Sequence, residues 1–319
     1  MGLQREAPES ITGELRVAAR RVPGSERTEI GRQYHTGALR ILRPHYAAGS
    51  GQAVLTVVNP GGGFLGADRY EIEYDGGPGS SVLLTTQSAT KVYRTPQGPA
   101  FQEQRFTLAP GAVLESVPDP AIAYQDASFV QDTEVDLADA TSHFFGAEIV
   151  TPGWAADGTC FRYSDVRLRT TVRSGGRLVL LDNLLLRPAD AHLTGLGWLE
   201  GRTHYASVVI AGAGAGEELL AKVRSICAEY AHDDAAGGAA GTTPAAGTPR
   251  VLAGSSLTAR AADAAAVLVI RALADGTDVL TELVHRLGTA ARQAREGGPA
   301  AARQAREGGP AAGWNLRKY

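Results

Sequence analysis

Glycine and proline recur at short intervals through most of this 319-residue chain and divide it into brief segments rich in apolar and β-branched residues. Both residue types interrupt helices and central strands, so each uninterrupted run can form only a short element. The breaks fall at Pro96, Gly98-Pro99, Pro110-Gly111, Pro118 to Pro120, Pro152-Gly153 and Gly175-Gly176. Many short strands with regular turns predict a sandwich, a barrel or a β-solenoid, and the pattern alone does not distinguish these three.

Apolar and alternating runs give the positions of the expected strands. These strands are 13–22, 53–58, 70–74, 81–86, 91–94, 106–108, 113–115, 129–135, 161–172, 177–186, 207–210 and 266–273. Residues 137–148 could begin a helix, but a strand is the preferred interpretation.

Two helices are expected in the C-terminal third, where apolar residues recur at helical spacing. The first stripe consists of Leu219, Leu220, Val223, Ile226, Cys227 and Tyr230. The second helix begins near Thr277, and its stripe consists of Val279, Leu280, Leu283, Val284 and Leu287.

The expected organisation is a single β-rich domain with flexible additions. Its parts are a disordered tail at 1–13, a core at 14–231 that ends in a helix, a low-complexity loop at 232–250, a strand and helix at 251–290 that complete the same domain, and a duplicated, partly disordered tail at 291–319. In that tail, residues 291–301 are repeated as 302–312, and the Gly-Gly-Pro of each copy breaks a continuous helix. The duplication is therefore interpreted as a slippage that the surface tolerates.

Composition excludes several classes of protein. The formal net charge of −3 lacks the basic excess of nucleic-acid-binding proteins. The two cysteines, Cys160 and Cys227, exclude a disulfide framework and a cysteine-rich zinc site. No apolar run approaches the ~20 residues that span a bilayer, and the polar segment from Met1 to Ser10 carries no signal-peptide pattern. We therefore expect a cytoplasmic protein that binds neither nucleic acid nor membranes.

Two glycine-rich loops imitate phosphate-binding motifs. Gly61 and Gly66 have the spacing of a P-loop, but Ala67 and Asp68 stand where the lysine and the hydroxyl residue belong. The second loop lies between a strand and a helix at 211–216, but two glutamates follow it and would oppose a pyrophosphate there. We interpret the first as a tight turn and the second as a flexible loop before a helix.

The sequence contains no recognisable catalytic motif. Its seven histidines form no HxH or HExxH pair, and no Gly-x-Ser-x-Gly elbow occurs. The densest carboxylate cluster is interpreted as a solvated face and consists of Asp119, Asp126, Asp132, Glu134, Asp136 and Asp139. We therefore predict no catalytic residues.

Four segments carry a resemblance when their order and spacing are taken together. They are Asn59 to Asp68, Thr85 to Arg94, Leu114 to Pro120 and Gly37 to Tyr46. In this respect the chain resembles the UreD (UreH) family of urease accessory proteins, most clearly over residues 30–200. It departs at Ala67, where the family usually has a second glycine before the aspartate.

The resemblance implies a fold and a role. The fold would be a β-helix-like stack of short strands with a few helices added. The role would be that of a non-catalytic scaffold or metallochaperone, which binds the urease apoprotein and UreF and, through UreF, the GTPase UreG. It would help to deliver nickel through an internal water-filled passage, with no tightly bound cofactor and only transient Ni²⁺.

The resemblance also suggests candidate residues. Asp68 and Glu148 are candidates for the nickel passage, which needs loosely held oxygen ligands. Candidates for the passage wall or the motif core are Thr85, Thr86, Gln87, Ser88 and Lys91, and the structural turn is assigned to Pro60, Gly61, Gly62, Gly63 and Gly66. For each candidate the alternative is internal hydrogen bonding that closes the strand stack.

The alternative function is a β-rich binding module with no link to urease. Such a module, for a carbohydrate for example, should expose many aromatic side chains. Aromatic residues make up only 6% of the chain, which counts against it.

Overall fold

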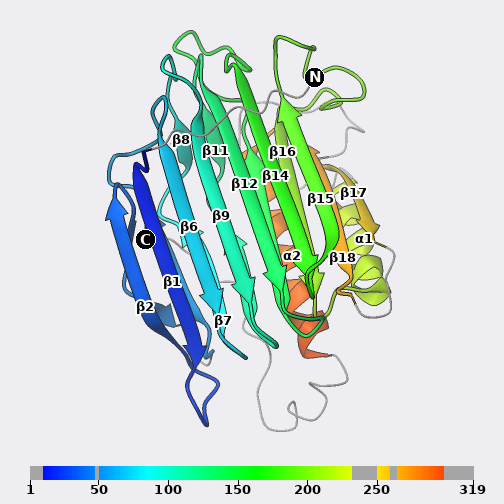
Figure 1. Cartoon of the computed structure of the whole chain (residues 1–319). Coiled ribbons are helices and arrows are strands. Elements are labelled where there is room, and N and C mark those ends of the chain that lie inside the picture. The colour runs from blue at the N-terminus through cyan, green and yellow to red at the C-terminus, as the bar shows by residue number, and fades with distance from the viewer. Residues whose placement is uncertain (1–9, 47–49, 232–249, 259–263, 298–319) are drawn as a thin grey trace.

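The computed structural model describes residues 10–46, 50–231, 250–258 and 264–297. In these residues the strands form a seven-stranded sheet, sheet A, and an eleven-stranded sheet, sheet B. Figure 1 shows sheet A in front and the two helices behind. The prediction of a mainly β fold with two C-terminal helices is confirmed, whereas the β-helix-like class stays a prediction.

The bounds of the elements are as follows. Sheet A consists of β1 (Gly13–Arg21), β2 (Thr28–Gly37), β6 (Arg69–Gly76), β9 (Ala100–Leu108), β12 (Ser128–Leu137), β14 (Asp165–Ser174) and β15 (Arg177–Leu186). Sheet B consists of β3 (Arg40–Ile41), β4 (His45–Tyr46), β5 (Ala53–Val58), β7 (Ser81–Thr86), β8 (Thr90–Val92), β10 (Val113–Val117), β11 (Ala121–Ala123), β13 (His143–Val150), β16 (His204–Gly212), β17 (Leu252–Leu257) and β18 (Val267–Ala274). The helices are α1 (Glu217–Ala231) and α2 (Thr277–Glu296).

From β5 to β14 the chain passes back and forth between the two sheets. In sheet A, β6, β9, β12 and β14 pair in parallel one after another. In sheet B, β5, β7, β10 and β13 do the same. Each crossing adds a strand to the sheet that the chain enters. Residues about thirty positions apart therefore lie in register, as in the pairing of Ile72 with Gln104.

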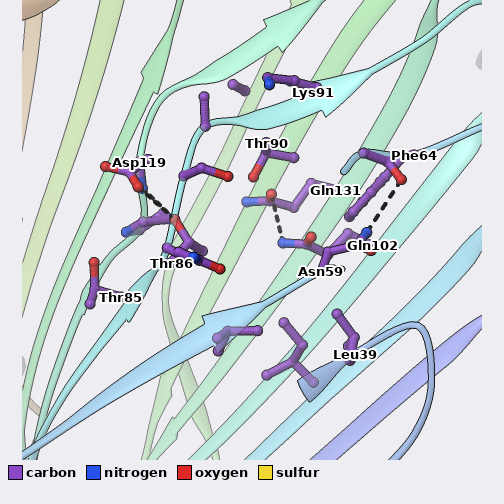
Figure 2. A pocket seen from close by; sticks show the side chains of 18 of the residues that line it. Leu39, Asn59, Phe64, Thr85, Thr86, Thr90, Lys91, Gln102, Asp119 and Gln131 are labelled. Carbon is purple, nitrogen blue, oxygen red and sulfur yellow. Dashed lines mark hydrogen bonds between the residues drawn. The ribbon is translucent and has the colours of Figure 1, made fainter. Parts of the chain in front are cut away.

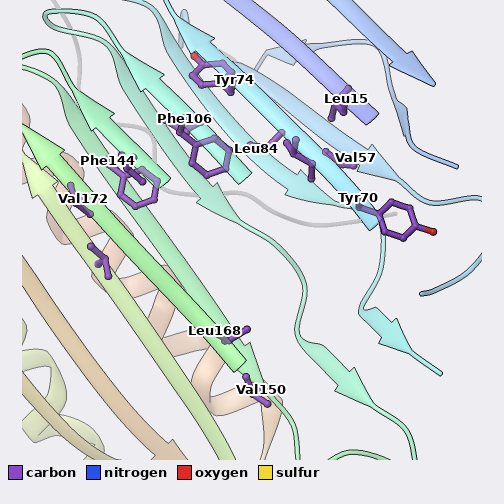
Figure 3. Packing of buried hydrophobic residues seen from close by; sticks show 14 of the residues in the cluster. Leu15, Val57, Tyr70, Tyr74, Leu84, Phe106, Phe144, Val150, Leu168 and Val172 are labelled. Atoms are coloured by element: carbon purple, nitrogen blue, oxygen red, sulfur yellow. The ribbon is translucent and has the colours of Figure 1, made fainter. Parts of the chain in front are cut away.

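Two apolar layers result from this arrangement. The first lies between the sheets, where alternate residues such as Tyr70, Ile72 and Tyr74 of β6 point inward, as the period of a strand requires (Figure 3). The second lies between sheet B and the helices, where Phe145 of β13 and Leu283 of α2 are buried. The central strands of sheet B, such as β10 and β13, are thus buried on both faces, whereas sheet A has an outer charged face on which Arg69 bridges Glu71 and Glu103.

A buried ion pair fixes the end of α2 on sheet B. Glu115 of β10 is 1% exposed and accepts a hydrogen bond of 2.7 Å from Nε of Arg292 at Oε1 and one of 3.1 Å from Nε2 of Gln52 at Oε2. The second oxygen also accepts from Arg292 Nη2, which donates to Gln52 Oε1 as well, at 2.7 Å. These charged bonds hold the pKa of Glu115 below its ordinary value, although burial alone would raise it.

The structure corrects two predicted boundaries. The predicted tail at 291–319 begins inside α2, because Ala291 is buried and Arg292 pairs with Glu115. The predicted tail at 1–13 is also too long, because the Thr12 hydroxyl donates to Asp68 and Gly13 pairs with Tyr70. Residues 1–9, the second copy of the duplication and nearly all of the predicted 232–250 loop lie outside the described residues.

Removing Arg292 tests this buried pair. Arg292→Ala leaves the Glu115 carboxylate buried without its main counter-charge, so we expect a loss of roughly 3–5 kcal/mol of folding free energy, measured by urea denaturation. Arg303→Ala makes the same change in the second copy of the duplicated segment. It is the matched control and should leave stability unchanged, since Arg292 already occupies Glu115. Equal stability of the parent chain and Arg292→Ala would contradict this account.

Candidate functional site

A cavity of about 80 Å³, lined by both polar and apolar side chains, lies between the two sheets and has room for a few water molecules (Figure 2). Its lining includes all five predicted wall residues, namely Thr85, Thr86, Gln87, Ser88 and Lys91. Gly62 and Gly63 of the predicted turn and Glu148 also contribute. The structure therefore brings together most of the candidates from the sequence, although their roles stay predictions.

Glu148 is the buried carboxylate of this cavity. It lies on β13 between Ala147 and Ile149, which face the helices, so its own side chain faces sheet A. There Gln131 Nε2 donates to Glu148 Oε1 at 2.7 Å, and Gln102 Nε2 donates to Gln131 Oε1 at 3.1 Å. Burial raises the pKa of Glu148 to about 7, and the bond from Gln131 only partly offsets it.

The polar interior continues beyond Glu148. A smaller cavity of about 20 Å³ shares Gln104, Ser116 and Glu148 with the first. Its other polar lining residues carry hydroxyl groups, and they are Thr133, Thr170 and Ser207. Glu148 thus lies where the two cavities meet.

Asp68 lies apart from this site. It is not among the residues that line either cavity. Its carboxylate instead accepts hydrogen bonds from Leu65 N at 2.7 Å, Thr12 Oγ1 at 3.2 Å and the Tyr70 hydroxyl at 3.3 Å. These bonds tie the glycine-rich turn to β1 and β6, which is the structural alternative that the sequence left open.

The turn shows why this segment is rich in glycine. A side chain on Gly63 would lie 2.7 Å from the Lys91 carbonyl oxygen and 2.6 Å from the Tyr93 ring, so the two segments approach too closely for a Cβ atom. Ala67 has a φ of 64°, in the left-handed region. A glycine is favoured there because of this backbone conformation.

The second glycine-rich loop has a packing role. A Cβ atom on Gly214 would lie 2.7 Å from the backbone nitrogen of Arg295, in the last turn of α2. The neighbouring Ala213 carbonyl accepts a hydrogen bond of 2.7 Å from Nδ1 of the buried His143. Gly214 therefore packs directly against the end of α2, and the two glutamates that open α1, Glu217 and Glu218, disfavour a pyrophosphate there.

Sequence reasoning missed several polar groups of the cavity. Gln102, Gln104 and Gln131 occupy inward positions of β9 and β12, where the strand period leads one to expect apolar residues. Asp119, which the sequence places on a solvated face, also lines the cavity and accepts from the Thr86 hydroxyl at 3.3 Å. A polar residue on the apolar face of a predicted strand was the available signal.

Two features are absent from the residues that the structure describes. In residues 10–46, 50–231, 250–258 and 264–297, no three His, Cys, Asp or Glu side chains converge as a metal site. No helix in these ranges is long and apolar enough to cross a membrane.

Comparison with known proteins gives a consistent result. The chain matches the family described as UreD urease accessory protein over residues 12–307. It is 42% identical over 290 residues to the urease accessory protein UreD of Actinomyces naeslundii, a match that covers 91% of this chain and 97% of that relative. It is also 42% identical over 286 residues to UreD of an Arthrobacter species, with 88% of each chain covered. With UreD of Corynebacterium glutamicum it shares 45% identity over 207 residues, which cover 64% of this chain and 72% of that relative.

The backbone at Ala67 provides a first test of the turn. Ala67→Gly relieves the cost of a left-handed conformation, so we expect a gain of about 1 kcal/mol in folding free energy, measured by urea denaturation. Ala253→Gly, in the exposed strand β17, is the control and should lose about 0.5–1 kcal/mol. A loss at both positions would show that Ala67 is not strained.

Glu148 predicts an unusual dependence of stability on pH. The folded chain keeps this proton up to about pH 7, whereas an unfolded glutamate loses it near 4.5. Its burial therefore lowers stability above pH 7, and this cost disappears as the pH falls to 4.5. Glu148→Gln should be more stable than the parent chain by roughly 1–3 kcal/mol at pH 8 and equally stable near pH 4.5.

His143 provides an internal comparison of opposite sign. Burial lowers its pKa from 6.5 to about 4, so the stability that it contributes is present above pH 6.5 and is lost toward pH 4. In the parent chain the two effects oppose each other between pH 4.5 and 6.5. In Glu148→Gln the His143 effect is no longer opposed by Glu148, so stability should fall on acidification. Parallel profiles for the two chains would show that Glu148 titrates normally.

Proposed function

Because the chain belongs to the UreD family of urease accessory proteins, we propose that it is a non-catalytic maturation factor that helps to deliver nickel to urease. In this proposal Ni²⁺ is the cargo and crosses the chain through the inter-sheet cavity. The urease apoprotein receives the metal, and UreF connects the chain to the GTPase UreG. All of these partners are expected in the cytoplasm, and the chain with them.

The position of Glu148 carries this proposal. A carboxylate buried without a cationic partner is costly, and such groups are more common at functional sites than elsewhere. Here its hydrogen-bond partner among the described residues is the neutral amide of Gln131. A divalent cation that passes would provide the missing positive charge.

The chemistry of the lining suits a cargo that must be released. Nickel binds nitrogen and sulfur ligands strongly, and oxygen ligands hold it more weakly. The cavity offers carboxylate, amide and hydroxyl oxygens, and neither histidine nor cysteine is among its lining residues. With one or two carboxylates in reach at a time, the ion would be guided without being trapped.

The proposed fold class supports a passage of this kind. In a β-helix-like stack the two sheets enclose a continuous interior, and polar side chains on successive inward positions line it along its length. Glu148 and Ser116 of sheet B and Gln104 of sheet A contribute polar side chains to this interior, each beside apolar neighbours on its own strand. We infer that the two cavities are sections of one route.

One observation favours the alternative, a binding module with no link to urease. Tyr93, Tyr124 and Trp154 form a row of rings with centroids 5.0 and 5.3 Å apart, and Trp154 is 54% exposed. Such a row could stack against a sugar or a peptide. Binding of soluble oligosaccharides that is lost in Trp154→Ala would support this function instead.

The nickel content of urease tests the main proposal. The chain is co-expressed with urease subunits, UreF and UreG, and nickel per urease and recovery of the complex are both measured. Glu148→Gln is expected to lower nickel content roughly tenfold, the scale seen when a group that supports a metal is lost, while the complex still assembles. Glu134→Gln, on the outer face of sheet A, is the matched control.

Asp68→Ala is a second variant for the same experiment. Since its carboxylate holds the turn by three hydrogen bonds, Asp68→Ala should reduce the yield of folded complex and leave the nickel content of the recovered complex unchanged. Full nickel loading with Glu148→Gln would overturn the proposed passage.

A further inference from the structure

Strand β15 has the composition of a central strand but lies at the edge of sheet A. Seven of its ten residues are leucine or valine, and they occupy both faces of the strand. Such continuous apolar runs are typical of strands that are covered on both sides. In sheet A, however, β15 is the terminal strand and pairs with β14 (Figure 1). Among the described residues no second strand pairs with it, so its outer edge presents backbone N–H and C=O groups.

The exposed apolar side chains of the described residues are concentrated at this edge. Five of the ten large ones lie on β15 or in the loop that follows it, and they are Leu178, Leu181, Leu185, Leu196 and Trp198. Leu181 is 62% exposed, and it follows Leu180, which packs on the core between the sheets. Leu185 follows Leu184 in the same way, so Leu181 and Leu185 point away from that core. A concentration of exposed apolar side chains of this kind is typical of a surface that binds another protein.

The opposite edge of sheet A shows how a terminal strand is normally protected. β2 carries Glu29 and Arg32 and is exposed along most of its length. Charged side chains on an edge strand oppose the addition of a further strand. On β15 the one carboxylate is that of Asp182, which forms an ion pair with Arg271 of β18 in sheet B. This ion pair fixes β15 on the other sheet, so its edge is a rigid template for a further strand.

The charge around this edge is basic. Five arginines lie on β14, on β15 or directly after β15, and they are Arg167, Arg169, Arg173, Arg177 and Arg187. Two of them are compensated, Arg169 by Asp132 and Arg187 by Asp190. Arg167 donates to the neutral amide oxygen of Asn183 at 3.0 Å. Within the part of the chain that the structure describes, Arg167, Arg173 and Arg177 have no ion pair, so the edge attracts negative charge.

We propose that the edge of β15 binds an extended, acidic segment of a partner protein, which adds to the seven-stranded sheet A as an eighth strand. Main-chain hydrogen bonds hold such a segment, and its alternate side chains cover Leu181 and Leu185. Its carboxylates approach Arg173 and Arg177, which lie at the end of the edge where β15 begins. The proposed segment has about the length of β15, which is ten residues.

Charge selects against a second copy of this chain as the occupant. Pairing of two β15 edges would bring both sets of arginines to one interface, with three uncompensated arginines from each copy. Like charges at an interface suppress association, whereas an acidic segment is attracted by the same arginines. The edge therefore fits an acidic partner better than it fits itself.

Peptide binding to the full chain tests this edge without nickel or urease. The probes are two fluorescein-labelled peptides as long as β15, in which valine and threonine alternate with glutamate in one peptide and with lysine in the other. Fluorescence anisotropy measures the affinity, and hydrogen exchange shows which backbone amides are protected. The proposal predicts that the acidic peptide binds and the basic one does not. Binding should protect the amides of residues 178–186 and leave those of β2 unchanged.

Two paired substitutions locate the site. Leu181→Lys with Leu185→Lys puts charges on the edge and should abolish binding of the acidic peptide, and both positions are exposed, so the fold should persist. Arg173→Glu with Arg177→Glu should weaken the acidic peptide about tenfold and strengthen the basic one. Arg32→Glu with Tyr34→Lys makes matched changes on the exposed edge strand β2 and should leave binding unchanged.

Three outcomes would overturn the proposal. They are failure of the acidic peptide to bind, equal binding of the two peptides, and protection of amides away from β15. A dimer of the chain, detected by light scattering and dissociated by Leu181→Lys with Leu185→Lys, would show that a second copy occupies the edge and that the proposed partner is wrong. Nickel loading in the Glu148→Gln experiment does not involve this edge, so the two proposals fail separately.

Discussion

The central strands of sheet B, such as β10 and β13, lie between sheet A and the two helices, so they have no face that water can reach freely. A charged side chain on this sheet must therefore find its compensation inside the protein. Two glutamates show the two possible results. Glu115 faces the helices, where Arg292 and Gln52 bind it and keep it ionised. Glu148 faces sheet A, where the neutral Gln131 amide leaves it uncompensated and burial raises its pKa.

The two glutamates therefore have different roles within one sheet. The Glu115 pair joins β10 to the last turns of α2 and closes the helix layer. This pair stabilises the fold because the carboxylate and the guanidinium group neutralise each other. Glu148 lowers stability at neutral pH, which a purely structural residue has no reason to do. Glu148 lies where the two cavities meet, and there the proposed passage would use an uncompensated carboxylate.

How far the sequence predicted these features depends on the kind of signal. Strands with one inward and one outward face, such as β1 and β6, were predicted because their alternation of apolar and polar residues follows their burial directly. β2 was missed because its residues are exposed along most of its length and carry no alternation. The helical end at Ala291–Glu296 was also missed. Its repeated composition suggested a tail, and only the fold brings Arg292 to Glu115 across 177 positions.

The residues of the candidate site were likewise predicted only where the sequence carries a recognisable motif. Thr85 to Lys91 were found through the resemblance, and the structure places them around one cavity. The glutamines of β9 and β12 carry no motif, and their importance appears only when parallel pairing sets Gln102 against Gln131. Asp68 has the sequence context of a functional residue, yet its hydrogen bonds are those of a turn anchor.

The prolines around Asp119 break the local rules for a strand in the middle of a sheet. A proline there removes a ladder hydrogen bond, and two in three residues remove the ladder altogether. A structural explanation alone would require some gain in packing, but the segment borders a cavity on one side and a groove on the other. The interruption leaves residues 147–149 of β13 with a strand partner on one side alone, where they pair with β16. Glu148 belongs to this part of β13, so the break in the sheet and the uncompensated carboxylate lie at the same place, and departures from regular structure of this kind are expected where a site is functional.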